Sequence, residues 1–255
     1  METGTTSPAA DDQFVYAISH DLRGPLLNFQ GFLRRLSDAC HDLASQAGGW
    51  NLTAEQRHDC DQLFQEKVWP SLEVLERNAR RMDRLLTALL KLSRAGGEPV
   101  QCEVVETTDV VRSVVEEFRA AASEERAVLT VEPLPDAWAD AERLRHVFQA
   151  LLENALKFLR AGRAGRIVVG GEVSDREVLC WVRDNGIGIK SENLARIFLP
   201  FGRLREMEAP GEGVGLAIAR KLMAQQNGRM WVESAHGEGS TFYLAFPADP
   251  PAGGI

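Results

Sequence analysis

The chain has 255 residues, of which 44% are hydrophobic and 26% charged, a composition typical of a globular protein large enough for two domains. Its 37 acidic and 29 basic residues give a net charge of -8. This balance excludes broad, sequence-independent binding to nucleic acid or anionic lipid, because such binding requires a surplus of positive charge.

The N-terminal stretch METGTTSPAADDQ has neither the charged leader and apolar run nor the small-residue cleavage site of a signal peptide. No later segment has the uninterrupted apolar length that a bilayer requires, so we expect a cytoplasmic chain without membrane contact. The cysteines are widely spaced and form no C-x-x-C pair, which favours apolar filler residues in a reducing compartment. They are Cys40, Cys60, Cys102 and Cys180.

Two long amphipathic helices are predicted in the first part of the chain. Apolar residues recur at steps of three and four from Phe14 to about Leu43, and again from Leu63 to Leu89, where Pro70 is expected to introduce a kink. The polar stretch 48–65 between them either extends the hairpin or forms a short helix. Such a hairpin leaves an apolar stripe too large to remain in water, so we expect two copies to pair as a four-helix bundle.

The helical pattern breaks at SRAGGEPVQ, residues 93–101, where we place a domain boundary. Beyond it, helical patterns alternate with runs rich in β-branched and aromatic residues, which predicts an α+β fold with helices on one face of a sheet. The predicted helices are 108–125 and 140–159, and the predicted strands are 127–132, 166–173, 177–184, 229–234 and 240–246. The expected organisation is a tail 1–13, a helical domain 14–95, an α/β domain 96–250 and a tail 251–255.

The motif DNGIGI follows a predicted strand and places Gly186 and Gly188 just after Asp184. Taken alone, it is equally well explained as a tight turn. The functional interpretation is that the glycines let the backbone approach a planar ligand while the Asp184 carboxylate accepts a hydrogen bond from an exocyclic amine such as that of adenine.

The segment GEGVGLAIARKL places Gly211, Gly213 and Gly215 immediately before a predicted helix. A glycine-rich loop that opens onto a helix N-terminus offers unpaired N–H groups to phosphates. Its spacing matches neither the dinucleotide fingerprint nor the P-loop.

The helix segment LLENALKF carries Asn154 and Lys157 on adjacent turns. Taken alone, these residues are most simply explained as a solvated polar face. Together with the two glycine segments, Asn154 could give an oxygen to Mg²⁺ and Lys157 a positive charge to a phosphate.

A histidine and an aspartate, His20 and Asp21, stand side by side in the first helix, with Pro25 five residues after the histidine. Together with the motifs above, the order and spacing of HDLR, Asn154, D-x-G-x-G and G-x-G-x-G-L resemble a sensor histidine kinase of a two-component system. The segments SHDLRGPL and LPDAWADAERLRHVF are most similar to the phytochrome-type branch. The similarity extends from Phe14 to Pro247.

The resemblance implies that the hairpin is a dimerisation and phosphotransfer domain and that the second domain is an ATP-binding fold of the Hsp90 and gyrase type. It implies that His20 is the phosphoacceptor and that Asp21 fixes the imidazole tautomer and accepts its proton. An imidazole with its ordinary pKa of about 6.5 is mostly neutral at cytosolic pH and can attack phosphorus.

The resemblance also implies roles around the nucleotide. Asn154 corresponds to the Mg²⁺ ligand, Lys157 to a phosphate contact and Asp184 to the adenine-binding acid. The remaining implied residues are the pocket glycines Gly186 and Gly188, the anchors of an ATP lid Phe198 and Phe201, the γ-phosphate cation Arg203 or Arg205, the closing loop Gly211, Gly213, Gly215 and Leu216, and Ser240 and Thr241 near the nucleotide.

Three positions depart from the family pattern. Ala150 stands where the family often has a second Asn, Glu212 replaces a hydroxyl residue beside the phosphates, and Gly24 replaces the Thr or Asn of members that act as phosphatases. The first two suggest weaker Mg²⁺ orientation and slow turnover. Gly24 predicts little phosphatase activity.

The sequence therefore predicts a homodimeric, ATP- and Mg²⁺-dependent protein-histidine kinase that passes its phosphoryl group to an aspartate of a response-regulator receiver domain. Its signal is expected to come from a separate sensor protein or from a sensor module that precedes the chain. One alternative is an ATP-binding scaffold with little catalysis. Another, an Hsp90-like ATPase, is disfavoured because such proteins have no use for a His-Asp helical hairpin.

Overall fold

The computed structural model describes residues 8–95, 99–174, 177–202 and 213–247. In the first helix, side chains are described for Tyr16 and from Asp21 onward. The chain divides into two compact units, residues 1–93 and 94–255, which are treated separately below.

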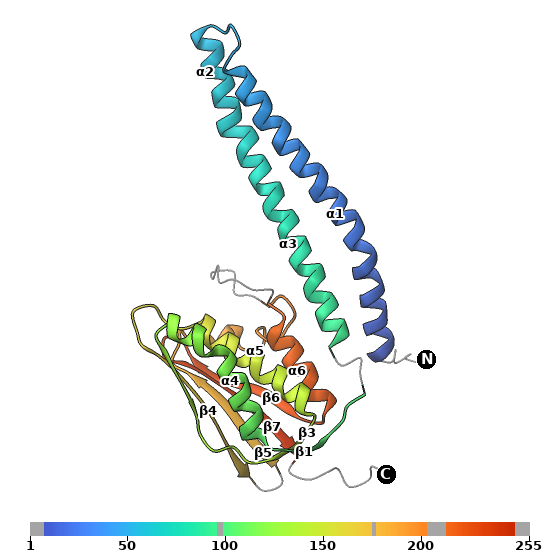
Figure 1. Ribbon diagram of the computed structural model, residues 1–255, viewed down its shortest axis with the longest axis vertical. Helices are drawn as coiled ribbons and strands as arrows, with labels where there is room; N and C mark the ends of the chain where they lie inside the picture. Colours follow the sequence, from blue (N-terminus) through green and yellow to red (C-terminus); the bar gives the residue numbers. More distant parts are fainter. Residues whose placement is uncertain (1–7, 96–98, 175–176, 203–212, 248–255) are drawn as a thin grey trace. The chain divides into compact units, whose positions relative to one another are not determined.

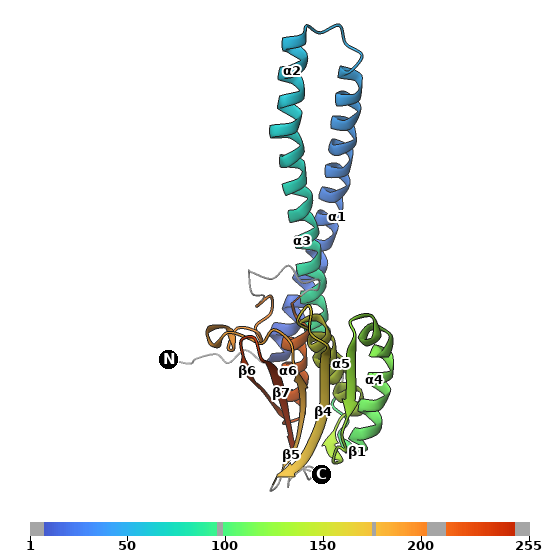
Figure 2. The same ribbon diagram turned by 90° about the vertical axis from the view of Figure 1, so that its left-hand side faces the viewer.

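The first unit is a helical hairpin (Figure 1). Helix α1 spans Pro8–Ala47, and the returning arm consists of α2, Ala54–Leu63, a π-helical turn η1, Phe64–Val68, and α3, Trp69–Arg94. Helices α1 and α3 run side by side in both views (Figures 1 and 2). The two long predicted helices are thus confirmed, and the polar stretch 48–65 contributes a short helix to the returning arm.

The kink expected near Pro70 takes the form of the π-helical turn η1. Proline has no N–H to donate, and its ring crowds the carbonyl four residues earlier. The helix widens by one residue just before Pro70, where the Trp69 N–H donates to the Phe64 carbonyl five residues back. Inside the hairpin at this level the Phe64 and Trp69 rings lie 5.4 Å apart, centroid to centroid.

Apolar residues of α1 form two stripes, each with a spacing of seven residues. The inner stripe consists of the buried Leu26, Leu33 and Ala47 and the partly buried Cys40. Of these, Leu33 and Cys40 pack against Leu72 and its neighbours on the other arm. The exposed stripe consists of Leu22, Phe29, Leu36 and Leu43. Together they make a continuous alternation of three- and four-residue steps, and half of it is uncovered in a single chain.

The second unit is a two-layer α/β fold. A five-stranded sheet has the order β2-β4-β5-β7-β6, in which only β2 and β4 are parallel. Helices α4, α5 and α6 cover one face of it (Figures 1 and 2). The strands are β2 Ala127–Val131, β4 Gly165–Ser174, β5 Glu177–Asp184, β6 Arg229–Ala235 and β7 Gly239–Pro247, and the helices are α4 Thr107–Glu124, α5 Ala141–Lys157, η2 Ser191–Asn193 and α6 Gly215–Gln225.

Two short strands were not predicted. Strands β1, Glu103–Val105, and β3, Ala137–Ala139, pair antiparallel in a separate two-stranded sheet. Each is three residues long, too short for an alternating pattern to be recognised in the sequence. The other predicted helices and strands, and the helices on one face of the sheet, are confirmed.

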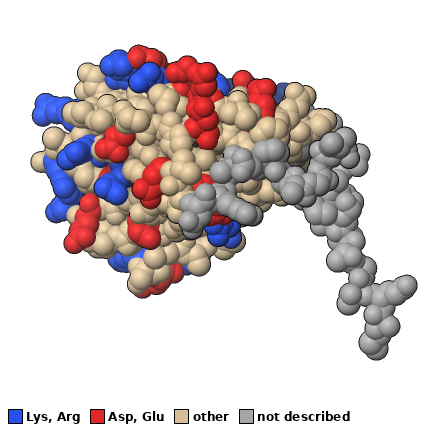
Figure 3. Space-filling model, turned by 90° about the horizontal axis from the view of Figure 1, so that it is seen from below, with Lys and Arg blue, Asp and Glu red and all other residues tan. Residues whose placement is uncertain are grey.

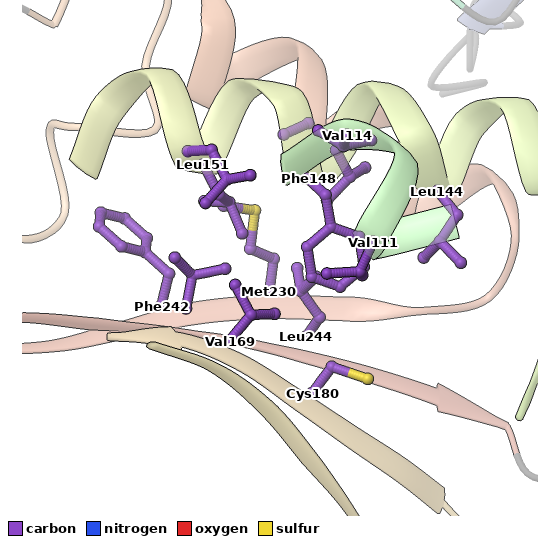
Figure 4. Packing of buried hydrophobic residues seen from close by; sticks show 14 of the residues in the cluster. Val111, Val114, Leu144, Phe148, Leu151, Val169, Cys180, Met230, Phe242 and Leu244 are labelled. Carbon is purple, nitrogen blue, oxygen red and sulfur yellow. The ribbon is translucent and has the colours of Figure 1, made fainter. Parts of the chain in front are cut away.

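The core lies between the helical layer and the sheet. Phe148 and Leu151 of α5 face Phe242 and Leu244 of β7 across it (Figure 4). Each fully buried large apolar side chain contributes about 1.5–3 kcal/mol. Cys180 belongs to this core, where burial raises the pKa of its thiol to about 12, so it acts as an apolar residue.

The surface carries charges of both signs. On the face shown in Figure 3, acidic and basic side chains are intermingled, and neither sign forms a continuous patch. Across the described ranges, no helix combines the length and the apolar character needed to cross a membrane.

Candidate functional site

Asp184 is the last residue of β5 and lies almost fully buried on the helix side of the sheet. Its Oδ1 atom accepts hydrogen bonds from the backbone N–H of Gly186 at 2.8 Å and of Ser240 at 3.3 Å. Burial raises the pKa of the carboxyl group to about 6, although these two N–H donors oppose the shift. Within the described part of the chain, no hydrogen bond is formed by Oδ2.

The turn after β5 needs glycine for reasons internal to the protein. A Cβ on Gly186 would lie 2.2 Å from the Phe158 carbonyl oxygen, and one on Gly188, where φ is +65°, would lie 1.9 Å from that of Ala235. The position that a Cβ would occupy at each glycine is therefore filled by backbone. Their role is to pack the turn against the end of α5 and the hairpin between β6 and β7.

The same turn joins Asp184 to the end of α5. The N–H of Ile187 donates to the Phe158 carbonyl at 3.0 Å. Asn154 and Lys157 lie three residues apart in the last turns of α5, both partly exposed, and therefore share one face of the helix. The Lys157 Nζ atom lies 5.1 Å from the centroid of the Phe158 ring. The C-terminal end of α5, with the predicted Asn154 and Lys157, thus lies next to the turn that follows the predicted Asp184 at the end of β5.

Helix α6 begins at Gly215, and no described side chain caps its N-terminus. Its first N–H groups are therefore a ready position for an anion. Gly213 has φ +75°, and its carbonyl accepts a hydrogen bond from the Phe201 N–H at 2.9 Å. A Cβ on Gly215 would lie 3.8 Å from the Cβ of Ala150. Ala150, which stands where the family often has a second Asn, therefore lies beside the start of α6. Leu216 is partly buried against the core.

The two phenylalanines have different environments. Phe198 is buried, meets Phe242 edge to face at 6.4 Å and lies under the guanidinium group of Arg220 at 5.3 Å, so it is part of the core. Phe201 is partly exposed with φ +61°, in the left-handed region that non-glycine residues seldom occupy. The predicted Arg203, Arg205, Gly211 and Glu212 lie outside the described residues.

Thr241 is not where the sequence placed it. In the register of β5 and β7, Asp184 pairs with Ser240 and Arg183 with Thr241, so Thr241 lies on the sheet face opposite the helices. Its Oγ1 accepts a hydrogen bond from the Arg183 Nε at 3.4 Å. The residue paired with Asp184 is Ser240, which directly precedes Thr241 in the chain. Strand alternation therefore corrects the prediction for Thr241.

Ser234 is a supporting residue that the sequence did not suggest. Its hydroxyl accepts from the Ile189 N–H at 2.8 Å, donates to the Gly239 carbonyl at 2.8 Å and lies 3.0 Å from the Ser240 hydroxyl. It thereby ties the turn after β5 to the β6–β7 hairpin. A lone serine in a strand carries no sequence signal for this role.

His20 and Asp21 lie in α1 of the hairpin, twenty-seven and twenty-six residues before its end at Ala47. Position 20 is related by seven-residue steps to Leu27, Arg34 and His41, all exposed, and belongs to neither apolar stripe. The side chain of Asp21 is exposed. A Cβ at Gly24 would meet nothing within 4 Å.

Comparison with known families matches both units. Residues 10–98 match the His Kinase A (phospho-acceptor) domain, and residues 139–250 match the histidine kinase-, DNA gyrase B- and HSP90-like ATPase domain. The chain therefore carries, in this order, the phospho-acceptor domain and the ATPase domain of a sensor histidine kinase catalytic core.

Two curated relatives and one solved structure illustrate the match. Cyanobacterial phytochrome A of Nostoc sp. is 32% identical over 92% of this chain, and the methanogenesis regulatory histidine kinase FilI of Methanothrix harundinacea is 30% identical over 92%. The chain spans only 28% and 24% of their respective lengths. Full-length ShkA, solved in complex with AMPPNP, superposes with a TM-score of 0.60 at 26% identity, covering 93% of this chain and 46% of that one.

Proposed function

We propose that this chain autophosphorylates on His20 with ATP and then passes the phosphoryl group to an aspartate of a response-regulator receiver domain. The observation that carries the proposal is the buried Asp184 carboxylate with one oxygen held by backbone and one available, in a chain whose other domain is of the phosphoacceptor type. The related full-length ShkA was solved in complex with AMPPNP, which supports nucleotide binding by this chain.

In this proposal the Asp184 Oδ2 atom accepts a hydrogen bond from the exocyclic amine of adenine. The phosphates extend towards the uncapped N-terminus of α6 at Gly215, where N–H groups and the helix dipole favour negative charge. Lys157 contributes a positive charge from the neighbouring end of α5. Arg203 or Arg205, in the segment between Phe201 and Gly213, is proposed as a further cation for the γ-phosphate.

The donor set fits a magnesium ion bound with the nucleotide. Asn154 offers a partly exposed amide oxygen that receives no hydrogen bond from the described residues, and Mg²⁺ prefers one or two protein oxygens together with phosphate oxygens. When bound, the ion would neutralise charge on the transferring phosphoryl group. In the described part of the chain, no group of three or more His, Cys, Asp or Glu side chains forms a separate metal site.

The transfer step requires alignment rather than elaborate chemistry. An imidazole nitrogen of His20 forms a bond to the γ-phosphorus while the bond from that phosphorus to the β,γ-bridging oxygen breaks. ADP leaves with the bridging oxygen, and the imidazole proton passes to Asp21. The phosphoryl group is then transferred from nitrogen to the receiver's aspartate.

We further propose that the chain acts as a homodimer. The exposed stripe Leu22, Phe29, Leu36 and Leu43 continues the heptad pattern that buries the other half of α1, and a second hairpin would cover it. The receiver docks on the hairpin near His20, and input comes from a sensor module or a separate sensor protein.

Labelling with γ-³²P ATP and Mg²⁺ tests the proposal. Wild type should acquire acid-labile, base-stable label, whereas His20→Ala and Asn154→Ala should not. Nucleotide binding without label on the wild type would indicate an ATP-binding scaffold instead. Phosphate release that persists in His20→Ala would indicate a simple ATPase.

A further inference from the structure

Asp140 lies where three parts of the second unit meet. It is the N-cap residue of α5, and its Oδ1 accepts a hydrogen bond from the Arg143 N–H at 3.1 Å. Its Oδ2 accepts from the backbone N–H of Gln101 at 2.9 Å, in the segment by which the chain enters this unit after α3. One buried carboxylate therefore holds both the start of α5 and the incoming chain.

The backbone of the same residue reaches the third element. The Asp140 N–H donates to the Gln226 Oε1 at 3.0 Å, and Gln226 is the C-cap residue of α6 with 2% of its surface exposed. Arg143, also buried, lies with its Nε 3.5 Å from the Asp140 Oδ2 and donates a hydrogen bond to Gln225. Asp140 and Arg143 thus join the first turn of α5 to the last turn of α6.

The ionised state of this carboxylate is favoured. Burial raises its pKa, but hydrogen bonds from Gln101 and Arg143 and the positive charge of Arg143 outweigh burial, and the pKa lies below the ordinary value. At neutral pH the links to Gln101 and to α5 are therefore charge-assisted hydrogen bonds, which are stronger than neutral ones.

Helices α5 and α6 have their other ends at the candidate nucleotide site. Asn154 and Lys157 lie near the C-terminus of α5, and Gly215 begins α6. A helix is stiff along its axis, so a small shift of either helix on nucleotide binding also moves the end at which Asp140 lies.

We infer that Asp140 is a positioning residue that couples the nucleotide state of α5 and α6 to the chain segment at Gln101. The inference rests on the proposed function, because it requires that nucleotide binds between the far ends of these helices. In this inference, bound nucleotide orders the chain segment around Gln101, which connects the second unit to α3 of the hairpin.

The test removes the Gln101 N–H that donates to the Asp140 Oδ2 and leaves the other hydrogen bonds of Asp140 in place. Gln101→Pro has no backbone donor for Asp140, whereas the matched control Gln101→Ala keeps it. In the full chain, Mg²⁺-ADP should slow hydrogen exchange in peptides covering residues 99–105 of the wild type and of Gln101→Ala, but not of Gln101→Pro. Autophosphorylation kcat should fall about tenfold in Gln101→Pro while KM for ATP stays within about twofold, a split that a general loss of stability would not give.

Asp140→Asn provides a second variant should Gln101→Pro fail to fold, because its single amide oxygen can keep the cap with the Arg143 N–H, while its NH2 group cannot accept from the Gln101 N–H. Its nucleotide-dependent protection at 99–105 should be reduced. Protection of residues 184–188 by Mg²⁺-ADP without any change at 99–105 in the wild type would overturn the coupling and leave the proposed function standing. Absence of protection at both places would overturn the nucleotide site itself.

Discussion

Asp184 combines a cost in stability with a proposed gain in binding. Its carboxyl group has a pKa of about 6 in the folded chain because it is buried, against an ordinary value of 3.8. The folded state therefore binds the proton more tightly than the unfolded state, and the contribution of this group to stability is full below about pH 4 and is lost as the pH rises through about 6. At neutral pH the ionised carboxylate is retained at a cost.

Asp184→Asn should remove that cost in stability and also weaken nucleotide binding. We expect the free energy of unfolding of the second unit to rise by about 1–2 kcal/mol at pH 7.5 and the affinity for ATP to fall by about 10- to 100-fold, because a charged acceptor is lost. Urea unfolding and titration with a fluorescent ATP analogue measure the two effects. An unchanged affinity would rule out the proposed adenine contact.

In the proposed site the adenine amine donates to the ionised form of Asp184, so nucleotide affinity should depend on pH. In the wild type we expect affinity to fall as the pH is lowered from 7.5 to 5, with a midpoint near the pKa of about 6. Calorimetric titrations across this range should show the fall in wild type and a flat profile for the residual binding of Asp184→Asn. An equal slope in both proteins would assign the pH dependence to another group.

Gly188 should tolerate no side chain. Its φ is +65°, and an added Cβ would lie 1.9 Å from the Ala235 carbonyl oxygen, a backbone atom that cannot easily move. Gly188→Ala should therefore lower the free energy of unfolding by about 2–4 kcal/mol. Gly215→Ala is the matched control, since its Cβ would make only an ordinary contact at 3.8 Å. Similar losses in both variants would contradict this account.

At the scale of single residues, a candidate position was easier to predict than the direction of its side chain. Asp184, Gly186 and Gly188 were proposed as site residues because their motif, which alone fits a tight turn equally well, occurs together with the other motifs. Thr241 was misplaced by a single residue, which on a strand means the opposite face. Ser234 and the Phe158 carbonyl could not be predicted, because their contacts depend on tertiary packing rather than residue type.

Among the helices, α2 depends on a capping box at its start. The Thr53 hydroxyl accepts from the Gln56 N–H at 3.2 Å, and the Gln56 side chain accepts from the Thr53 N–H at 3.0 Å. Thr53→Ala should lower the stability of the hairpin by about 1 kcal/mol, and Thr53→Ser, which keeps the hydroxyl, should lose much less. Thermal unfolding followed by far-UV circular dichroism compares the two, and equal melting temperatures would show that the cap is not needed.

Long elements were predictable and short ones were not. The apolar periodicity of α1, α3, α4 and α5 continues over many turns and signals helix without reference to the fold. Strands β1 and β3 form because the intervening chain, which includes α4 and β2, brings Val105 opposite Ala137. The π-helical turn before Pro70 was foreseen only as a kink, since local crowding at proline can be relieved in several ways.

For the whole molecule, the uncovered heptad stripe predicts self-association. Leu36→Glu places a charge in the proposed dimer interface and should give a monomer with autophosphorylation reduced at least about tenfold if transfer requires the dimer. Arg34→Glu, exposed but outside both stripes, should leave the dimer intact. Sedimentation velocity distinguishes the two, and a dimer that survives Leu36→Glu would exclude this stripe as the interface.

The sheet order also determines when the protein can first become functional during synthesis. Strand β7 is the last to be made, yet it lies inside the sheet, hydrogen-bonded to β5 on one side and β6 on the other, and it brings the Ser240 N–H to Asp184. A nascent chain therefore has neither the complete sheet nor the Ser240 hydrogen bond to Asp184 until Pro247 has left the ribosomal tunnel. Premature termination anywhere before that strand should yield a chain that exposes its core and is degraded, rather than one that retains part of the proposed activity.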